Sequence, residues 1–100
     1  MSDNILTIDE IKTILSPIAK KYQVDAILLF GSYAKGLADG QSDVDLVVFG
    51  GSSFNPTDIF AMAEDIRATL RKQADVYDIR EINPGTAFYN SIFQEGVYVA

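Results

Sequence analysis

The chain has 100 residues, of which 48% are hydrophobic, and its formal net charge is −6. This length fits one domain with a core of its own, so residues 1–100 are expected to form a single domain, and the acidic balance argues against a nucleic acid as a direct ligand. Because cysteine and histidine are both absent, disulfides, thiol catalysis, imidazole bases and cysteine- or histidine-bound zinc are excluded, and any metal site must be built from oxygen.

The first residues, Met-Ser-Asp-Asn, carry neither a basic segment nor a long apolar run. We therefore expect a cytoplasmic protein that does not enter a membrane. Thr7 and Glu10 have the spacing of a capping box. Apolar residues at helical spacing then predict a helix over residues 8–21, and Pro17 within it predicts a kink or an early end.

Two apolar runs predict the next strands, over residues 25–30 and 44–49. The first run is apolar throughout, which indicates burial on both faces. Between the strands we expect a short helix over residues 32–37, begun by the Ser32 hydroxyl, and then a polar turn.

The second half of the chain predicts two more helices and two more strands. Asn55 and Pro56 are a favourable start for a helix that reaches about residue 70. The alternation over residues 74–82 predicts a third strand, and a short strand follows over 97–99.

Between these two strands, Asn83 and Pro84 are expected to start a helix that runs to about residue 95, with Phe88, Ile92 and Phe93 facing inward. The order of all the elements predicts an α/β fold in which a small mixed β-sheet is packed with helices.

Two carboxylates stand at the head of the strand predicted over residues 44–49. Asp43 and Asp45 are two residues apart, so their side chains project from the same face of the strand. Asp75 lies in the third predicted strand, where it can come alongside them. Three carboxylates this close repel one another unless cations lie between them, which favours Mg²⁺ or Mn²⁺. The alternative for the Asp43–Asp45 pair is a frayed, solvated strand start.

The identity of the third acid is open at this point, because Asp75 and Asp78 have opposite parity and only one of them can share the metal face. The turn at Gly31 and Ser32 raises a similar choice. Free backbone N–H groups after a strand suit phosphate oxygens, and glycine lets the backbone approach closely. A tight turn without a ligand is the alternative.

The stretch Phe30-Gly31-Ser32-Tyr33-Ala34-Lys35-Gly36, followed by Ser42-Asp43-Val44-Asp45-Leu46, resembles the signature of the minimal nucleotidyltransferases of the DNA polymerase beta superfamily. The resemblance covers nearly the whole chain, since residues 74–79 are similar to the family's third aspartate strand and residues 92–100 to its closing helix and strand. It implies the nucleotidyltransferase fold, with a sheet like the polymerase beta palm.

The resemblance also implies roles for individual residues. The catalytic residues and metal ligands would be Asp43, Asp45 and Asp75. The nucleotide would be contacted by Gly31, Ser32, Lys35 and Ser42. Two Mg²⁺ ions, or Mn²⁺, are the implied cofactors, and ATP is the implied substrate. The family more often has arginine where Lys35 stands; a lysine still meets a phosphate, but as a point charge.

The implied reaction is transfer of AMP from ATP to a hydroxyl group, with Asp75 receiving the proton because the chain has no histidine. Stand-alone members of this size resemble the antitoxin of a toxin–antitoxin pair whose partner is a helical HEPN-domain toxin, and the implied acceptor is a tyrosine of that toxin. A non-catalytic, nucleotide-binding antitoxin that neutralises its partner by direct contact remains the alternative.

Overall fold

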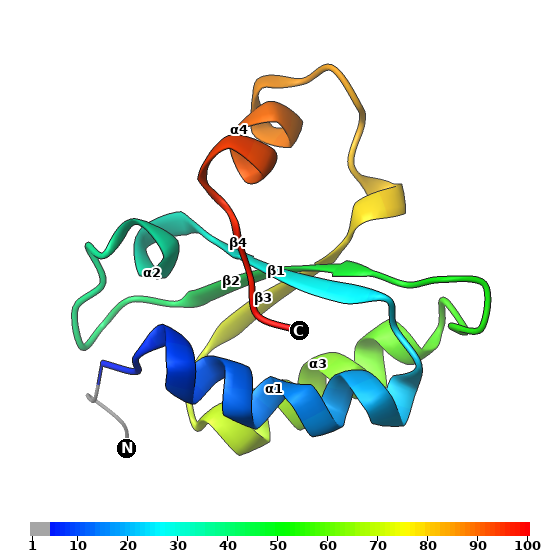
Figure 1. The fold of residues 1–100 in the computed structure, drawn as a ribbon, viewed down its shortest axis with the longest axis horizontal. Helices are drawn as coiled ribbons and strands as arrows, with labels where there is room; N and C mark the ends of the chain where they lie inside the picture. Colours follow the sequence, from blue (N-terminus) through cyan, green and yellow to red (C-terminus); the bar gives the residue numbers. More distant parts are fainter. Residues whose placement is uncertain (1–4) are drawn as a thin grey trace.

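Helices and strands alternate along the part of the chain that the computed structural model describes, residues 5–100 (Figure 1). In chain order they are α1 (Ile8–Tyr22), β1 (Ala26–Phe30), α2 (Gly31–Lys35), β2 (Val44–Phe49), α3 (Asp58–Leu70), β3 (Ala74–Asp78), the 3-10 helix η1 (Ile79–Glu81), α4 (Ala87–Glu95) and β4 (Val97–Tyr98). None of the helices in this range is long and apolar enough to cross a bilayer.

The four strands form one mixed sheet in the order β3-β2-β1-β4. Strand β1 is antiparallel to both β2 and β4, whereas β2 and β3 are parallel and are joined through α3. Helices α1 and α3 cover one face of the sheet, and α4 lies on the other face (Figure 1). The predicted α/β fold with a small mixed sheet is confirmed.

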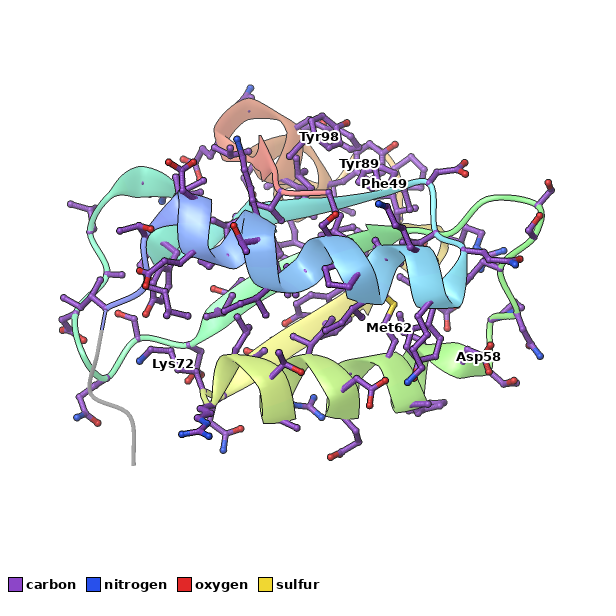
Figure 2. All side chains as sticks on the ribbon, turned by 60° about the horizontal axis from the view of Figure 1, so that its bottom comes forward. Phe49, Asp58, Met62, Lys72, Tyr89 and Tyr98 are labelled. Carbon is purple, nitrogen blue, oxygen red and sulfur yellow. The ribbon has the colours of Figure 1, made fainter. Side chains whose placement is uncertain are left out.

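The two faces of the sheet bury different side chains. The larger core lies under α1 and α3 and includes Ile11, Leu29, Leu46 and Ile66. The smaller cluster contains Leu28, Val47 and Ile92 and lies under α4. Figure 2 shows Met62 between α3 and the sheet, and Phe49, Tyr89 and Tyr98 on the α4 side. Side chains of β1 and β2 therefore alternate between the two layers, as strand geometry requires.

The predicted capping box of α1 is confirmed. The Glu10 backbone N–H donates to Thr7 Oγ1 at 3.0 Å, and the Thr7 N–H donates to Glu10 Oε1 at 2.8 Å. The early end predicted at Pro17 was wrong, because α1 continues past it to Tyr22. Pro17 is exposed, so water can solvate the carbonyl that loses its helical partner there.

Several predicted boundaries in the second half were wrong by a few residues. Helix α3 begins at Asp58, because Asn55 Oδ1 accepts hydrogen bonds from the Thr57 N–H at 3.2 Å and the Thr57 hydroxyl at 2.9 Å and holds a turn before the helix. Helix α4 begins after Thr86, whose hydroxyl accepts from the Tyr89 N–H at 3.1 Å. The residues from Asn83 to Thr86 form a separate turn.

Candidate active site

Asp45 and Asp75 lie directly opposite each other on the neighbouring strands β2 and β3. Val47 packs under α4, and Asp45 is two residues before it on the same strand. The side chains of Asp45 and of its partner Asp75 therefore project to the α4 face of the sheet. Burial raises the pKa of Asp45 from 3.8 to about 6, with further contributions from the charge and hydrogen bond of Asp75 and from the charge of Asp43. Two carboxylates are thus held together against their mutual repulsion.

Asp43 stands outside this contact. It precedes the first residue of β2 and is exposed, because no strand pairing holds it. Among residues 5–100, no three acidic side chains are close enough together to hold a metal ion. The structure therefore brings two of the three predicted acids together, while Asp43 acts on Asp45 only through its charge.

The donor set suits a hard divalent cation. Asp45 and Asp75 offer carboxylate oxygens at one point, and these are the ligands that Mg²⁺ and Mn²⁺ prefer. The raised pKa of Asp45 reflects a repulsion that a cation between the two groups would relieve. Asp43 is at the exposed end of the same face, two residues before Asp45.

The second acid of β3 has a different role. Asp78 pairs with Val48 in the sheet and is 8% exposed. Its Oδ2 forms an ion pair with Arg80 Nη2 at 3.0 Å, and its Oδ1 accepts the Arg80 N–H at 3.0 Å. Burial alone would raise the pKa of Asp78, but these bonds and the Arg80 charge lower it. Asp78 therefore caps the 3-10 helix η1, and its side chain lies on the opposite face of the sheet from Asp75.

Gly31 closes the site from the end of β1. Its φ of +75° lies in the region that favours glycine, and a Cβ built on it would overlap Asp45 Oδ2. The predicted start of α2 by the Ser32 hydroxyl was wrong. The helix begins at Gly31 after Phe30, without a side-chain cap, so Ser32 lies inside the first turn. The Ser32 hydroxyl therefore does not cap α2.

The other two residues predicted to contact the nucleotide, Lys35 and Ser42, bond to neighbouring residues of the chain. Lys35 Nζ forms an ion pair with Glu95 Oε1 of α4 at 3.3 Å, and both side chains are half-exposed. The Ser42 hydroxyl accepts the Asp39 N–H at 2.9 Å and closes the turn before β2. Lys35 could exchange Glu95 for a phosphate at little cost, since exposed ion pairs contribute weakly to stability.

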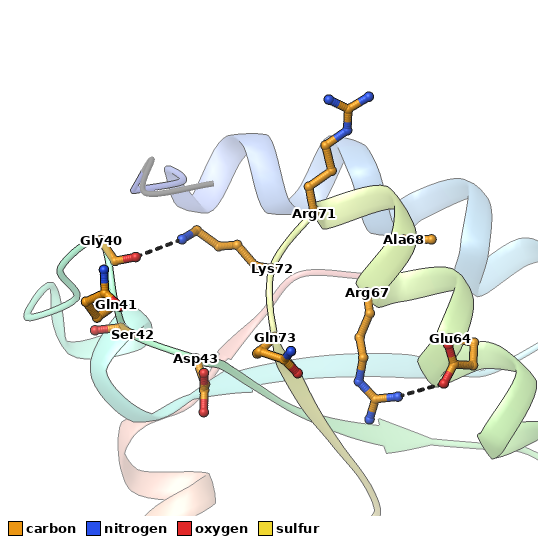
Figure 3. A pocket seen from close by; sticks show the side chains of 10 residues that line it. All are labelled: Gly40, Gln41, Ser42, Asp43, Glu64, Arg67, Ala68, Arg71, Lys72 and Gln73. Atoms are coloured by element: carbon orange, nitrogen blue, oxygen red, sulfur yellow. Dashed lines mark hydrogen bonds and ion pairs between the residues drawn. The ribbon is translucent and has the colours of Figure 1, made fainter. Parts of the chain in front are cut away.

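A cleft of about 620 Å³ adjoins Asp43 on the side of α3 (Figure 3). Its basic residues are Arg67, Arg71 and Lys72. Arg67 Nε donates to the Ala74 carbonyl at 3.0 Å, and Figure 3 shows Lys72 directed toward Gly40. Because Asp45 and Asp75 do not line it, this cleft is separate from the carboxylate pair.

Three aromatic residues beside the carboxylate pair were not predicted from the sequence to belong to the site: Phe30, Tyr77 and Phe88. Phe30 is the register partner of Asp45, and Tyr77 follows Asp75 by two residues on the same face. Burial raises the pKa of Tyr77, and the charges of Asp75 and Asp45 raise it further. Strand parity was the available signal for Tyr77, but no local pattern placed Phe88 above it.

Comparison with protein families gives one clear match. A family model described as "Polymerase beta, Nucleotidyltransferase" matches residues 11–100. "Putative protein adenylyltransferase MJ0435" of Methanocaldococcus jannaschii is 32% identical over 79 residues, which are 79% of this chain and 85% of that protein.

Solved structures share the fold at lower identity. A structure described as a "putative minimal nucleotidyltransferase" has a TM-score of 0.76 at 18% identity, covering 92% of this chain and 95% of that one. The structure of tri-AMPylated Shewanella oneidensis HEPN toxin in complex with MNT antitoxin has a TM-score of 0.70 at 17% identity, covering 94% of this chain and 72% of the matched chain. A toxin–antitoxin with AMP-PNP has a TM-score of 0.74 at 20% identity, covering 89% and 72%.

Proposed function

Because the chain belongs to the polymerase beta nucleotidyltransferase family, we propose that it transfers AMP from ATP to a hydroxyl group of a partner protein. The observation that carries the proposal is the register pair of Asp45 and Asp75 beside the glycine turn of Gly31. The proposal treats residues 1–100 as one catalytic domain.

In this reaction the acceptor oxygen attacks the α-phosphorus of ATP, the bond from that phosphorus to the bridging oxygen breaks, and pyrophosphate leaves. Asp75 would take the acceptor proton; its exposed position on the edge strand β3 supports this role. Gly31 and Ser32 would present backbone N–H groups to the phosphates. Lys35 is the last residue of α2, and Ser42 lies near the end of the loop that leads to β2.

Asp45, Asp75 and Asp43 would hold the divalent cations, two Mg²⁺ or Mn²⁺. When bound, such ions lower the pKa of an attacking hydroxyl and balance the charge of the leaving pyrophosphate. The protein's own contribution is to hold two carboxylates at one point, with the pKa of Asp45 at about 6, so that they are ready to bind a cation.

For the acceptor we propose a tyrosine of a cognate HEPN-domain toxin, with this chain as the antitoxin. Support comes from the protein adenylyltransferase name of the archaeal relative and from the fold shared with the MNT antitoxin of the AMPylated HEPN toxin. The exposed edge strand β3 and the open side of the carboxylate pair leave room for a second protein to present its hydroxyl.

The test is intact-mass spectrometry of the chain mixed with the toxin encoded beside it, ATP and Mg²⁺. Each transferred AMP should add about 329 Da to the toxin, the mass that remains after pyrophosphate leaves. Asp45→Asn should abolish the addition. An unmodified toxin that is inhibited equally well by wild type and Asp45→Asn would instead establish the non-catalytic, nucleotide-binding antitoxin.

A further inference from the structure

Three aromatic rings from three different elements meet on the α4 face of the sheet. They are Phe30 at the end of β1, Tyr77 on β3 and Phe88 on α4, and we call them the aromatic triangle. The ring centroids are 5.9 Å apart for Phe30 and Tyr77, and 5.7 Å apart for each of the other two pairs. Each ring therefore contacts both of the others in tilted or edge-on geometry.

The aromatic triangle lies beside the carboxylate pair. Phe30 is the register partner of Asp45, which is in turn the partner of Asp75. Phe30 also immediately precedes Gly31, so the triangle borders the turn that faces the Asp45 carboxylate. Apolar rings, acidic groups and the glycine turn thus form one continuous surface.

The aromatic triangle is only partly buried. Tyr77 is 38% exposed and Phe88 is 42% exposed, whereas Ile92 is fully buried and packs α4 against Leu28 and Val47. Helix α4 is held to the sheet by Ile92 and also by the rings that Phe88 and Phe93 contact, and Tyr77 and Phe88 still keep open surface next to charged groups. Exposed aromatic rings beside a carboxylate pair that would hold a divalent cation suit a ligand with a planar group at one end and, at the other, an anionic group that binds the cation.

We propose that the aromatic triangle is the platform on which the base of the nucleoside triphosphate stacks. The inference rests on the proposed function, which puts the phosphates at the carboxylate pair and the Gly31 turn. A nucleotide held there by its phosphates has its base within reach of the adjoining rings. Every nucleobase has a π-face, so stacking adds affinity that the phosphate contacts alone do not give.

The test compares Mg²⁺–ATP with Mg²⁺–tripolyphosphate, which lacks the base, by titration calorimetry. Phe88→Leu keeps an apolar side chain but removes the ring. Phe93→Leu is the matched control, because Phe93 is also on α4, is 45% exposed and contacts the ring of Phe49 edge-on at 5.9 Å. Phe88→Leu should weaken ATP binding at least about fivefold and leave tripolyphosphate binding within about twofold. Phe93→Leu should change neither.

Other outcomes would overturn the platform. Equal loss of ATP and tripolyphosphate affinity in Phe88→Leu would mean that the ring only supports the site, and unchanged ATP affinity would mean that the base lies elsewhere. Tyr77→Leu on β3 repeats the test if the α4 variant does not fold. If the wild-type chain binds neither ligand, the proposed function itself fails, and that result is distinct from a failure of the platform alone.

Discussion

Gly31 and the carboxylate of Asp45 are so close that a methyl group on Gly31 would overlap Asp45 Oδ2. The two residues lie on different elements, but the pairing of Phe30 with Asp45 brings the turn after β1 directly over the acid. The position of the carboxylate therefore depends on the absence of a side chain at residue 31 as much as on the sheet itself.

Gly31→Ala should abolish Mg²⁺-dependent ATP binding and AMP transfer. The methyl group would displace Asp45, and the positive φ would cost about 1 kcal/mol of folding free energy. Gly85→Ala is the control, since Gly85 has a φ of +87° but no atom within 4 Å of an added Cβ. Both variants should lose stability in urea titrations, Gly31→Ala at least as much because its methyl group also meets Asp45, and only Gly31→Ala should lose ATP binding. Equal ATP affinity in the two variants would contradict the prediction.

Asp45→Asn should stabilise the metal-free protein, and only above mildly acidic pH. Because the pKa of Asp45 is raised from 3.8 to about 6 in the folded state, wild-type stability falls as the pH rises through this window. Asparagine does not titrate, so the variant should gain about 1–2 kcal/mol at neutral pH, less than the full shift gives because water screens a partly exposed group.

The measurement for Asp45→Asn is urea denaturation in a chelating buffer between about pH 4 and pH 7.5, over the window that the raised pKa defines. The stability difference between variant and wild type should shrink toward acidic pH. A stability difference that stays constant across the pH range would show that the pKa of Asp45 is not raised in the folded protein.

Asp75→Asn and Asp78→Asn should separate catalysis from structure. Asp75 is exposed and faces Asp45, so its variant should fold normally and lose AMP transfer. Asp78 is buried and bonded to Arg80, so its variant should lose about 1–3 kcal/mol of folding free energy. Toxin mass and thermal unfolding of both proteins give the answer. Transfer at the wild-type rate by Asp75→Asn would exclude it as the proton acceptor.

ATP affinity should be far higher with Mg²⁺ or Mn²⁺ than with a chelator, because Asp45 and Asp75 repel a bare triphosphate. Calorimetric titrations with and without the cation measure the difference. Asp9→Asn, an exposed change on α1, should keep the full cation dependence. Equal ATP affinity with and without the ion in the wild-type chain would rule out the carboxylate pair as a metal site.

The strand that carries Asp45 was predicted to the residue, because the apolar run over Val44–Phe49 is buried between two layers of helices. Strand β3 was predicted four residues too long. Asp78 accepts the Arg80 N–H, and this local bond turns the backbone into η1 where alternation alone predicted more strand. Competition between a side chain and the sheet for one N–H group is not visible in a pattern of hydrophobicity.

Within the candidate site, strand parity correctly predicted that Asp75 and Asp78 lie on opposite faces of the sheet, but it did not predict which residues surround them. The ion pair of Lys35 with Glu95 depends on how α4 packs over α2. Contacts between segments that are distant along the chain cannot be predicted from local sequence patterns. The same applies to Phe88 and Phe93, which were predicted to face inward. They are 42% and 45% exposed, whereas Ile92 is the fully buried residue of α4 and packs against Leu28 and Val47.

The site also has an order of assembly. Gly31 and Asp45 belong to one short stretch that closes when β1 pairs with β2, whereas Asp75 arrives only after α3 has crossed to bring in β3. Short loops close at lower entropic cost, so we expect the antiparallel pair to form early and the parallel strand late. Asp75→Asn should then slow unfolding while leaving the folding rate nearly unchanged in stopped-flow experiments without metal. The repulsion between the two acids opposes only the last stage of folding, when the rest of the sheet already exists to withstand it.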